Sequence, residues 1–300
     1  MKFQNYTDWQ DTADTVHLLL QMAGKVKVVR CDKRPEWSHI RLYLTLDGLS
    51  TGIVPCNESP FVIHFNFRED KIEFRSYIGK TAEILLQDGK SIRTYYEQFT
   101  VALKQIGAPT RINVRPQEFY DPIDFDKDEK HHSYDKKAVM IWLDNLFFAY
   151  RSLCRFLAPF RGKTASPAYY FGTMDLTCIV FSGEPKDFGR KGKVMPYAFD
   201  ERFYECGFWP GDPVFPEPAF FAMPYPFMPD IQGNDHLIRP DKAFFKPAKQ
   251  EFFLTLKDAL TYPDPEDKVA EFCRSGLDIV QKINPWKDFE WITRPLDYPG

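Results

Sequence analysis

A histidine near the start of the chain could perform acid–base chemistry. His17 lies about 80° from the centre of the apolar stripe of a helix predicted over residues 9–23. Asp14 and Gln21 lie on the same side, so the imidazole has a carboxylate within reach. The position equally suits a histidine that is satisfied by local hydrogen bonds. Lys25 follows the end of the stripe and can either cap the last carbonyls of the helix or hold an anionic group.

The enzyme hypothesis pairs a histidine with an acid of the second half. The candidates are His17 or His39 as the acid–base and Asp175, which stands in an apolar strand region and needs a partner if it is buried. Lys25 or Lys163 would hold an anionic group of the substrate. This enzyme hypothesis predicts that the histidine and the carboxylate lie within hydrogen-bond reach around a cavity.

Strands predicted at 40–46, 61–67 and 71–77 alternate apolar and polar residues. If helices cover the apolar side, the other face is free for solvent or a ligand. That face carries Arg41, Tyr43 and His64, which together could hold a carboxylate or phosphate and a flat ring. An exposed face with cross-strand charge pairs explains the same pattern.

Residues 203–229 are rich in proline and aromatic residues, with few charges. Repeated prolines exclude a helix, and the apolar content argues against a disordered linker. We expect a strand, a tight turn at Trp209, and extended segments packed on a sheet. Trp209 would then form a pocket wall, or an exposed patch for a protein partner. Cys206 in this segment is expected to be an inert, packed thiol.

Several familiar motifs are incomplete. Three Gly-Lys-Ser/Thr triplets lack the earlier glycine of a phosphate-binding loop. The acidic run 124–135 has calcium-loop spacing, but Glu129 replaces the required glycine. The adjacent His131 and His132 are poorly placed to share one ion. No metal site and no cofactor are therefore predicted.

Composition excludes other classes. The chain has 300 residues and a net charge of −3 without a long basic run, which argues against nucleic-acid binding. It has no stretch apolar enough for a membrane span and no secretory signal pattern at its start. The six scattered cysteines are typical of reduced thiols. We expect a cytoplasmic protein that is a monomer or a small homo-oligomer.

The order of predicted elements indicates an α+β fold of two similar halves. Residues 1–116 would form a helix, three or four antiparallel strands and a helix, and residues 138–300 would repeat this order. A charged connection, 117–137, would join them. Each sheet would pack against its helices on one face, and short sequence echoes between the halves suggest an internal duplication.

The chain resembles a family of bacterial proteins described as a domain of unknown function, DUF5996. The similarity extends over most of the chain, and its most specific block is the run from Gly207 to Gly211. It departs from the family pattern at Ala168 and Phe171, where other members have a His and a Trp. The resemblance implies no activity.

The leading functional hypothesis is a pocket for a small polar or aromatic ligand in a cleft between the two halves. Its walls would be the polar strand face with Arg41, Tyr43 and His64, and the Trp209 loop. Lys25 would contribute to the same ligand site. The enzyme and the protein-interaction module are the alternatives.

Overall fold

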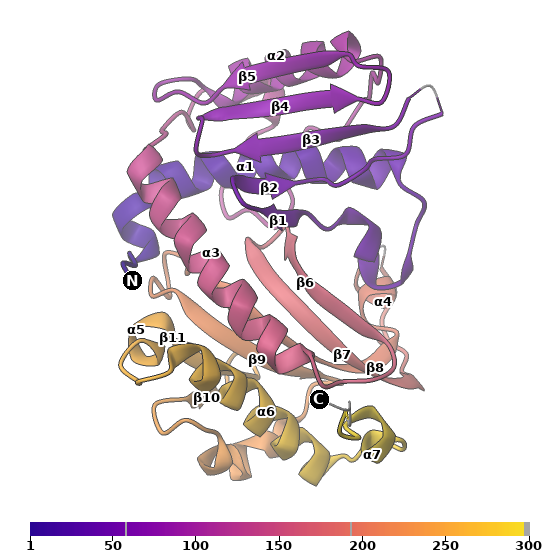
Figure 1. Cartoon of the computed structure of the whole chain (residues 1–300), viewed down its shortest axis with the longest axis vertical. Helices are drawn as coiled ribbons and strands as arrows, with labels where there is room; N and C mark the ends of the chain where they lie inside the picture. The colour runs from indigo at the N-terminus through magenta and orange to yellow at the C-terminus, as the bar shows by residue number, and fades with distance from the viewer. Residues whose placement is uncertain (58, 193, 297–300) are drawn as a thin grey trace.

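The computed structural model describes residues 1–57, 59–192 and 194–296. In this part of the chain helices accompany two antiparallel sheets, which makes the fold α+β, as the order of elements predicts (Figure 1).

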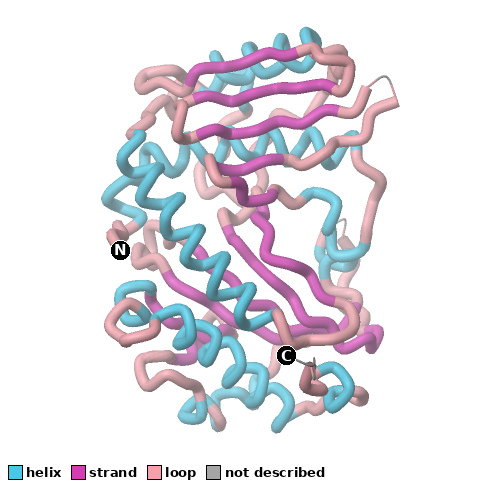
Figure 2. The backbone as a smooth tube through the Cα atoms, in the orientation of Figure 1, coloured by secondary structure: helices cyan, strands magenta, loops and turns pink. Residues whose placement is uncertain are grey.

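The first sheet has five strands in the order of the chain, each antiparallel to the next. Two helices, α1 (Tyr6–Arg30) and α2 (Ile92–Gln105), lie behind it in Figure 1, and its other face is open (Figures 1 and 2). Apolar residues alternate along the central strands, which is why one face packs on the helices. The strands are β1 (Tyr43–Thr45), β2 (Gly48–Ser50), β3 (Phe61–Asn66), β4 (Lys71–Ser76) and β5 (Thr81–Leu85).

The second sheet has six strands in the order β10-β11-β9-β8-β7-β6. Helices α3 (Lys136–Leu157) and α6 (Pro265–Ile283) cover the face that is turned toward the viewer in Figure 1. The strands are β6 (Thr164–Tyr170), β7 (Asp175–Pro185), β8 (Glu201–Trp209), β9 (Ala219–Tyr225), β10 (Phe244–Lys246) and β11 (Glu251–Thr255). Shorter helices complete the chain: η1 (Pro35–Ile40), η2 (Phe125–Lys127), α4 (Met195–Ala198), η3 (Pro229–Gly233), η4 (Asp235–Leu237), α5 (Leu256–Ala259) and α7 (Phe289–Ile292).

The two sheets are joined by a backbone bridge and share a core. Leu42 and Tyr169 exchange both backbone hydrogen bonds, at 2.9 and 2.8 Å, so the start of the first sheet touches β6. One cluster of buried apolar side chains includes residues of α1, β3 and α2 together with residues of α3, β7 and α6. The halves therefore share the main hydrophobic core, and two smaller apolar clusters lie on the second sheet.

Helix α1 is longer than the sequence pattern predicts. Its cap is Asn5 with Asp8 at the third position, so the helix begins at Tyr6, before the predicted range of residues 9–23, and it continues past Gly24 to Arg30. Gly24 therefore lies inside the helix, where the lack of a side chain allows close packing. A Cβ at this position would lie 1.9 Å from the ring of Phe171.

Two strand predictions need correction. Residues 40–46 were expected as one strand, but η1 ends at Ile40 and β1 has only three residues, with Leu46 exposed. The region 169–181 is divided into β6 and β7 by a turn at residues 171–174. In that turn Met174 has a φ of 62°, a left-handed conformation that hydrophobic patterning does not reveal.

The charged connection is packed on the fold, and is not the solvated linker that its composition suggests. Asp128 and Phe125 are fully buried. Nδ1 of His131 donates to Asp128 Oδ2 at 2.7 Å, and the backbone N–H groups of Lys130 and His131 donate to Asp128 Oδ1. These hydrogen bonds replace water and make the burial of a carboxyl group tolerable. Within the described residues no group of three or more His, Cys, Asp and Glu side chains could hold a metal ion.

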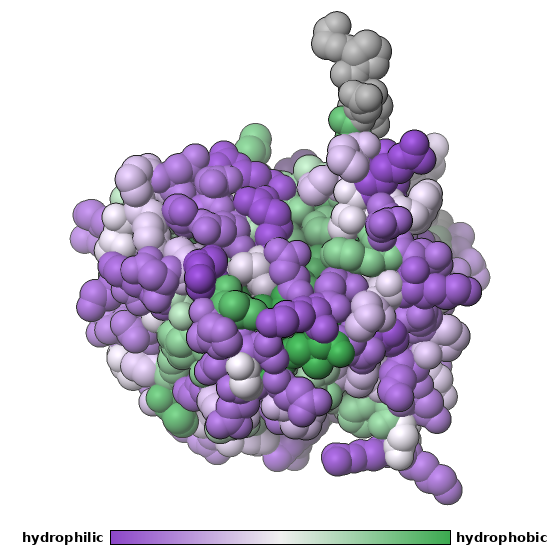
Figure 3. Space-filling view, turned by 90° about the horizontal axis from the view of Figure 1, so that it is seen from below, coloured by the Kyte–Doolittle hydropathy of each residue, from purple (hydrophilic) through white to green (hydrophobic). Residues whose placement is uncertain are grey.

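The surface seen from below is mostly hydrophilic, with apolar side chains gathered near its centre (Figure 3). Among the helices of the described residues, none has the length and the apolar character needed to cross a bilayer.

Candidate ligand-binding site

A cavity of about 780 Å³ lies against the face of the second sheet that α3 and α6 do not cover. Its volume is in the range of pockets that hold small molecules. Strand alternation explains its floor: side chains of one parity pack into the core under the helices, and those of the other parity face the cavity. The floor consists of Asp175, Ile179, Phe203, Glu205, Trp209, Phe221, Met223, Glu251 and Phe253.

Segments from the rest of the chain form the other walls. Tyr6 and His17 come from α1, Trp37 comes from η1, and the turn 171–174 and the loop 211–214 complete the rim. The connection contributes residues 117–120. Trp37 Nε1 donates to the carbonyl of Val194 at 3.1 Å, which fixes η1 to the segment before α4.

Carboxyl groups are spread over the floor. Glu205 on β8 is opposite Met223 on β9, and Glu251 begins the next strand, one residue before Phe252, which pairs with Ala222. One strand therefore separates Glu205 from Glu251, which places their backbones about 10 Å apart. Asp175 stands at the start of β7, on the other side of Glu205.

The surroundings of these carboxyls favour their neutral forms. Desolvation raises the pKa of Glu205 to about 7. The nearby Thr177 hydroxyl and the positive charge of Arg41 oppose this rise, and Glu251 adds to it. Desolvation also raises the pKa of Glu251, against the effect of Lys249. The pKa of Asp175 is raised for the same primary reason, with added repulsion from Glu205 and Glu251. The three groups thus form one electrostatic cluster.

Aromatic rings flank this cluster on both sides. One group surrounds Phe203 and Tyr225, whose rings stack with centroids 5.5 Å apart. The other surrounds Trp209, which stacks on Phe215 at 5.7 Å. Gly207 leaves space for this packing, because a Cβ there would lie 2.5 Å from the ring of Phe221.

Arg41 reaches the cavity through a tyrosine. Its side chain is buried, and Nε donates to the hydroxyl of Tyr170 at 2.9 Å. Tyr170 lines the cavity, and burial raises its pKa to about 12 while Arg41 lowers it. Arg41 itself is not a wall residue. It stands behind the wall and acts on Glu205 through its charge.

His17 lines the cavity, and its Nε2 contacts two backbone carbonyls and, at 3.1 Å, the side-chain amide of Gln21. Its Nε2 lies 2.8 Å from the carbonyl of Phe171 and 3.1 Å from that of Gly172, so this nitrogen carries the proton. Burial lowers the pKa of His17 to about 4, which keeps the ring neutral. His17 therefore fastens the turn 171–174 to α1. The structure brings it to the same cavity as Asp175, without a hydrogen bond between them in the described part of the chain.

Asp14 holds two tyrosines of the cavity wall. The hydroxyl of Tyr6 donates to Oδ1 at 2.5 Å, and that of Tyr120 donates to Oδ2 at 2.6 Å. Burial raises the pKa of Asp14, and the two tyrosine hydrogen bonds lower it. These contacts fix one rim of the cavity to α1.

Other residues expected at a site lie outside the cavity. His39 is buried and stacks on Trp37, with Nδ1 accepting from the N–H of Arg34 at 3.2 Å. Lys25 is buried, and its Nζ donates to the carbonyl of Arg115 at 2.7 Å. Lys163 forms ion pairs with Glu36 and Glu201. Cys206 faces the core beneath the helices, where burial raises the pKa of its thiol.

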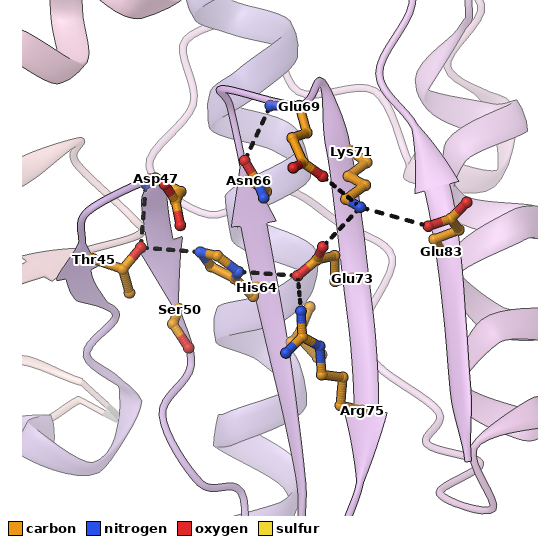
Figure 4. A network of polar contacts seen from close by, with 12 residues as sticks. Thr45, Asp47, Ser50, His64, Asn66, Glu69, Lys71, Glu73, Arg75 and Glu83 are labelled. Atoms are coloured by element: carbon orange, nitrogen blue, oxygen red, sulfur yellow. Dashed lines mark hydrogen bonds and ion pairs between the residues drawn. The ribbon is translucent and has the colours of Figure 1, made fainter. Parts of the chain in front are cut away.

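The polar face of the first sheet is a separate surface. His64 forms contacts with Thr45 at 3.0 Å and with Glu73 at 3.3 Å, and the network continues to Lys71 and Arg75 (Figure 4). Tyr43 is exposed at the edge of this sheet. Neither His64 nor Tyr43 lines the cavity, whereas Trp209 does.

Sequence reasoning did not single out Glu205, Glu251 or Tyr170 as site residues. For Glu205 a signal was present: it alternates with Phe203, Gly207 and Trp209 in an apolar strand, as Asp175 does in its own. Glu251 stands at a strand end, where an acid is unremarkable. No local pattern distinguishes it.

With this geometry defined, comparison with known proteins adds one finding. The model of a family of unknown function, DUF5996, matches residues 3–291. The chain belongs to this family. No curated protein and no solved structure matches it. The cavity of this DUF5996 member therefore has to be interpreted from its own residues.

Proposed function

We propose that this protein binds a small polar or aromatic molecule in the cavity on the second sheet. The single observation that supports the proposal most is the combination of about 780 Å³ of space, two aromatic groups and a central carboxyl cluster. Ligand sites are typically apolar hollows with a few convergent polar groups. The site lies between segments of both halves, since α1 and η1 cover the floor of the second sheet.

Rigid positioning also supports ligand binding. Tyr6 and Tyr120 are held by Asp14, and the turn 171–174 is held by His17. Walls that are fixed before a ligand arrives reduce the entropy lost on binding. The position of Trp209 in the wall favours the pocket over a protein-docking patch.

A thermal-shift screen of the purified chain against amines, amino acids, sugars, nucleosides and carboxylic acids tests the proposal. A ligand present at 100 times its Kd adds about 2.7 kcal/mol, which corresponds to a rise in Tm of several degrees. The rise should shrink in Trp209→Ala and Phe221→Ala. It should persist in His64→Asn, which changes the separate polar face of the first sheet.

If a ligand stabilises the pocket variants as strongly as the unchanged chain, it binds elsewhere and the proposal fails. Loss of binding in His64→Asn alone would move the site to the first sheet.

Acid–base catalysis is a second candidate function, favoured by Glu205. A carboxyl group with a pKa near 7 in a cavity is suited to donate and accept protons at neutral pH. The histidine form of this hypothesis has less support, because Nε2 of His17 is engaged by backbone and His39 does not line the cavity. A ligand that is converted by the chain, but not by Glu205→Gln, would establish catalysis.

A further inference from the structure

Charge around the cavity is unevenly distributed. Six acidic residues line it. Among the lining residues that the structure describes, Lys249 is the only lysine or arginine. Glu36 is paired with Lys163, and Asp212 accepts from the backbone N–H groups of Val214 and Phe215. The other lining acids are Glu118, Asp175, Glu205 and Glu251.

The three acids on the cavity floor, Asp175, Glu205 and Glu251, have no basic side chain at ion-pair distance among the residues that the structure describes. Thr177, on the same face of β7, has a buried hydroxyl close enough to Glu205 to lower the pKa of that carboxyl, yet within the described residues it lacks a hydrogen bond of good geometry. Buried polar groups normally have partners, so these carboxyls could accept a hydrogen-bond donor or a cation that a ligand brings into the cavity.

The protein already places an ammonium group against the aromatic side of the cavity. Lys249 Nζ lies 4.5 Å from the ring centroid of Trp209 and 6.0 Å from that of Phe253. Its charge also acts on Glu251, whose pKa it lowers. Lys249 is exposed and lies in the turn between β10 and β11, so it reaches the rings from the rim. The wall thus accommodates an ammonium group by cation–π contact.

Building on the proposed function, we propose that the ligand carries an ammonium group, which binds between the Glu205 and Glu251 carboxyls and the rings around Trp209. Lys249 then occupies part of the subsite when the ligand is absent, and the ligand's cation competes with it. The remaining aromatic rings would hold an apolar or aromatic body of the same ligand.

A matched charge series tests the inference by isothermal titration calorimetry at pH 8. The probes are 2-phenylethylammonium, 2-phenylethanol and 3-phenylpropanoate, which have similar size and differ in charge. We expect the ammonium compound to bind at least about tenfold more tightly than the other two, because only it gains the carboxyl and cation–π contacts. Equal or tighter binding of the alcohol or the carboxylate would overturn the inference.

Proton linkage gives a second readout. Glu205 must lose its proton to pair with the ligand's cation, and its pKa is about 7. Affinity for 2-phenylethylammonium should therefore fall roughly tenfold from pH 8 to pH 6. Titration in two buffers of different ionisation enthalpy should show proton release near pH 6.5. Glu205→Gln should weaken binding and remove both effects.

Lys249 provides the most specific test. Lys249→Met removes the competing ammonium and should raise the affinity for 2-phenylethylammonium about three- to fivefold. Lys242→Met is the matched control, because Lys242 lies 5.8 Å from the ring of Tyr262, away from the cavity lining, and should leave affinity unchanged. A loss of affinity for 2-phenylethylammonium in Lys249→Met would show that this lysine supports binding and does not compete with the ligand's cation, which contradicts the inference.

The outcomes separate this inference from the proposed function. If a neutral or anionic compound binds and Trp209→Ala weakens it, the pocket is real and the cation preference is wrong. If neither the series nor the wider screen contains a compound that binds through the cavity, both proposals fall.

Discussion

At the scale of single residues, Glu205 combines a position in the cavity with a carboxyl group that resists ionisation. Its pKa is raised to about 7 from the ordinary value of 4.5. The folded chain therefore holds this proton between about pH 4.5 and 7, where the unfolded chain has lost it. Stability contributed by the protonated form is present below the unfolded pKa and decreases as pH rises toward 7.

Glu205→Gln should remove this pH-dependent loss. At pH 8 the variant should exceed the unchanged chain by about 1 to 3 kcal/mol in free energy of unfolding, because the amide is never ionised. At pH 4.5 the difference should be close to zero. Urea denaturation at the two pH values measures it, with the exposed Glu290→Gln as control. An equal effect of Glu205→Gln at both pH values would contradict a titrating Glu205.

Gly24 is important because it has no side chain, which leaves room for the Phe171 ring. Gly24→Ala would force a Cβ to 1.9 Å from the Phe171 ring, and this ring shares its turn with the backbone carbonyl that His17 holds. We expect a loss of about 2 to 4 kcal/mol in free energy of unfolding. Chemical denaturation tests this, with Gly233→Ala as control because nothing lies within 4 Å of its added Cβ. A loss below that of the control would show that the ring moves aside freely.

At the scale of elements, a helix cap anchors the end of the charged segment 117–137 to the fold. Asp135 caps α3: its Oδ1 accepts from the N–H of Lys137 at 2.8 Å and of Ala138 at 3.4 Å, while its own N–H donates to Thr12. The first turn of α3 thereby receives partners that the helix cannot supply itself.

Asp135→Ala should lower the free energy of unfolding by about 1 kcal/mol through loss of the cap. The hydrogen bond from the backbone N–H of residue 135 to the Thr12 hydroxyl does not involve the Asp135 side chain and should remain. Asp144→Ala, an exposed acid within the same helix, is the matched control and should change stability by less than about 0.5 kcal/mol. Comparison of the two unfolding midpoints in urea decides the point.

The elements themselves were largely predictable, because their signals are local. The alternation of Phe61, Ile63 and Phe65 predicts β3, and Asp264 followed by Pro265 predicts the start of α6. The local pattern predicts a helix end at residue 23, and it cannot show that Gly24 lies inside α1, because the Phe171 ring that packs on Gly24 is almost 150 residues away in the chain. The division between β6 and β7 depends on backbone geometry at Met174, which composition does not reveal.

The site was less predictable, for the same physical reason. Arg41 and Trp209 are distinctive in the sequence, yet only their partners, Tyr170 and Lys249, show what they do. His64 belongs to an equally convincing pattern of alternating strand residues, but in the structure it lies on a salt-bridged sheet face away from the cavity. A pattern identifies which face a side chain occupies. It does not identify what packs opposite that face.

At the scale of the whole molecule, the shared core and the Leu42–Tyr169 bridge couple the two sheets. Helix α1, which packs on the first sheet, also contacts α3, which covers the second sheet, so neither half can open without exposing the common core. Cooperative unfolding follows when core contacts are shared in this way.

The chain should therefore unfold in one transition. Circular dichroism at far-ultraviolet wavelengths and tryptophan fluorescence should give the same midpoint in urea. Residues 1–116, expressed alone, should lack cooperative unfolding because part of their core surface is exposed. Two resolved transitions, or a folded 1–116 fragment, would show that the halves are independent.

The cavity wall begins at Tyr6 and ends at Phe253, so it joins nearly the whole length of the chain. Contacts with such large sequence separation cost much loop entropy and form late during folding. The cavity should thus be absent from the folding transition state. A bound ligand would then leave the folding rate unchanged and slow only unfolding, acting as a kinetic lock on a structure that is already complete.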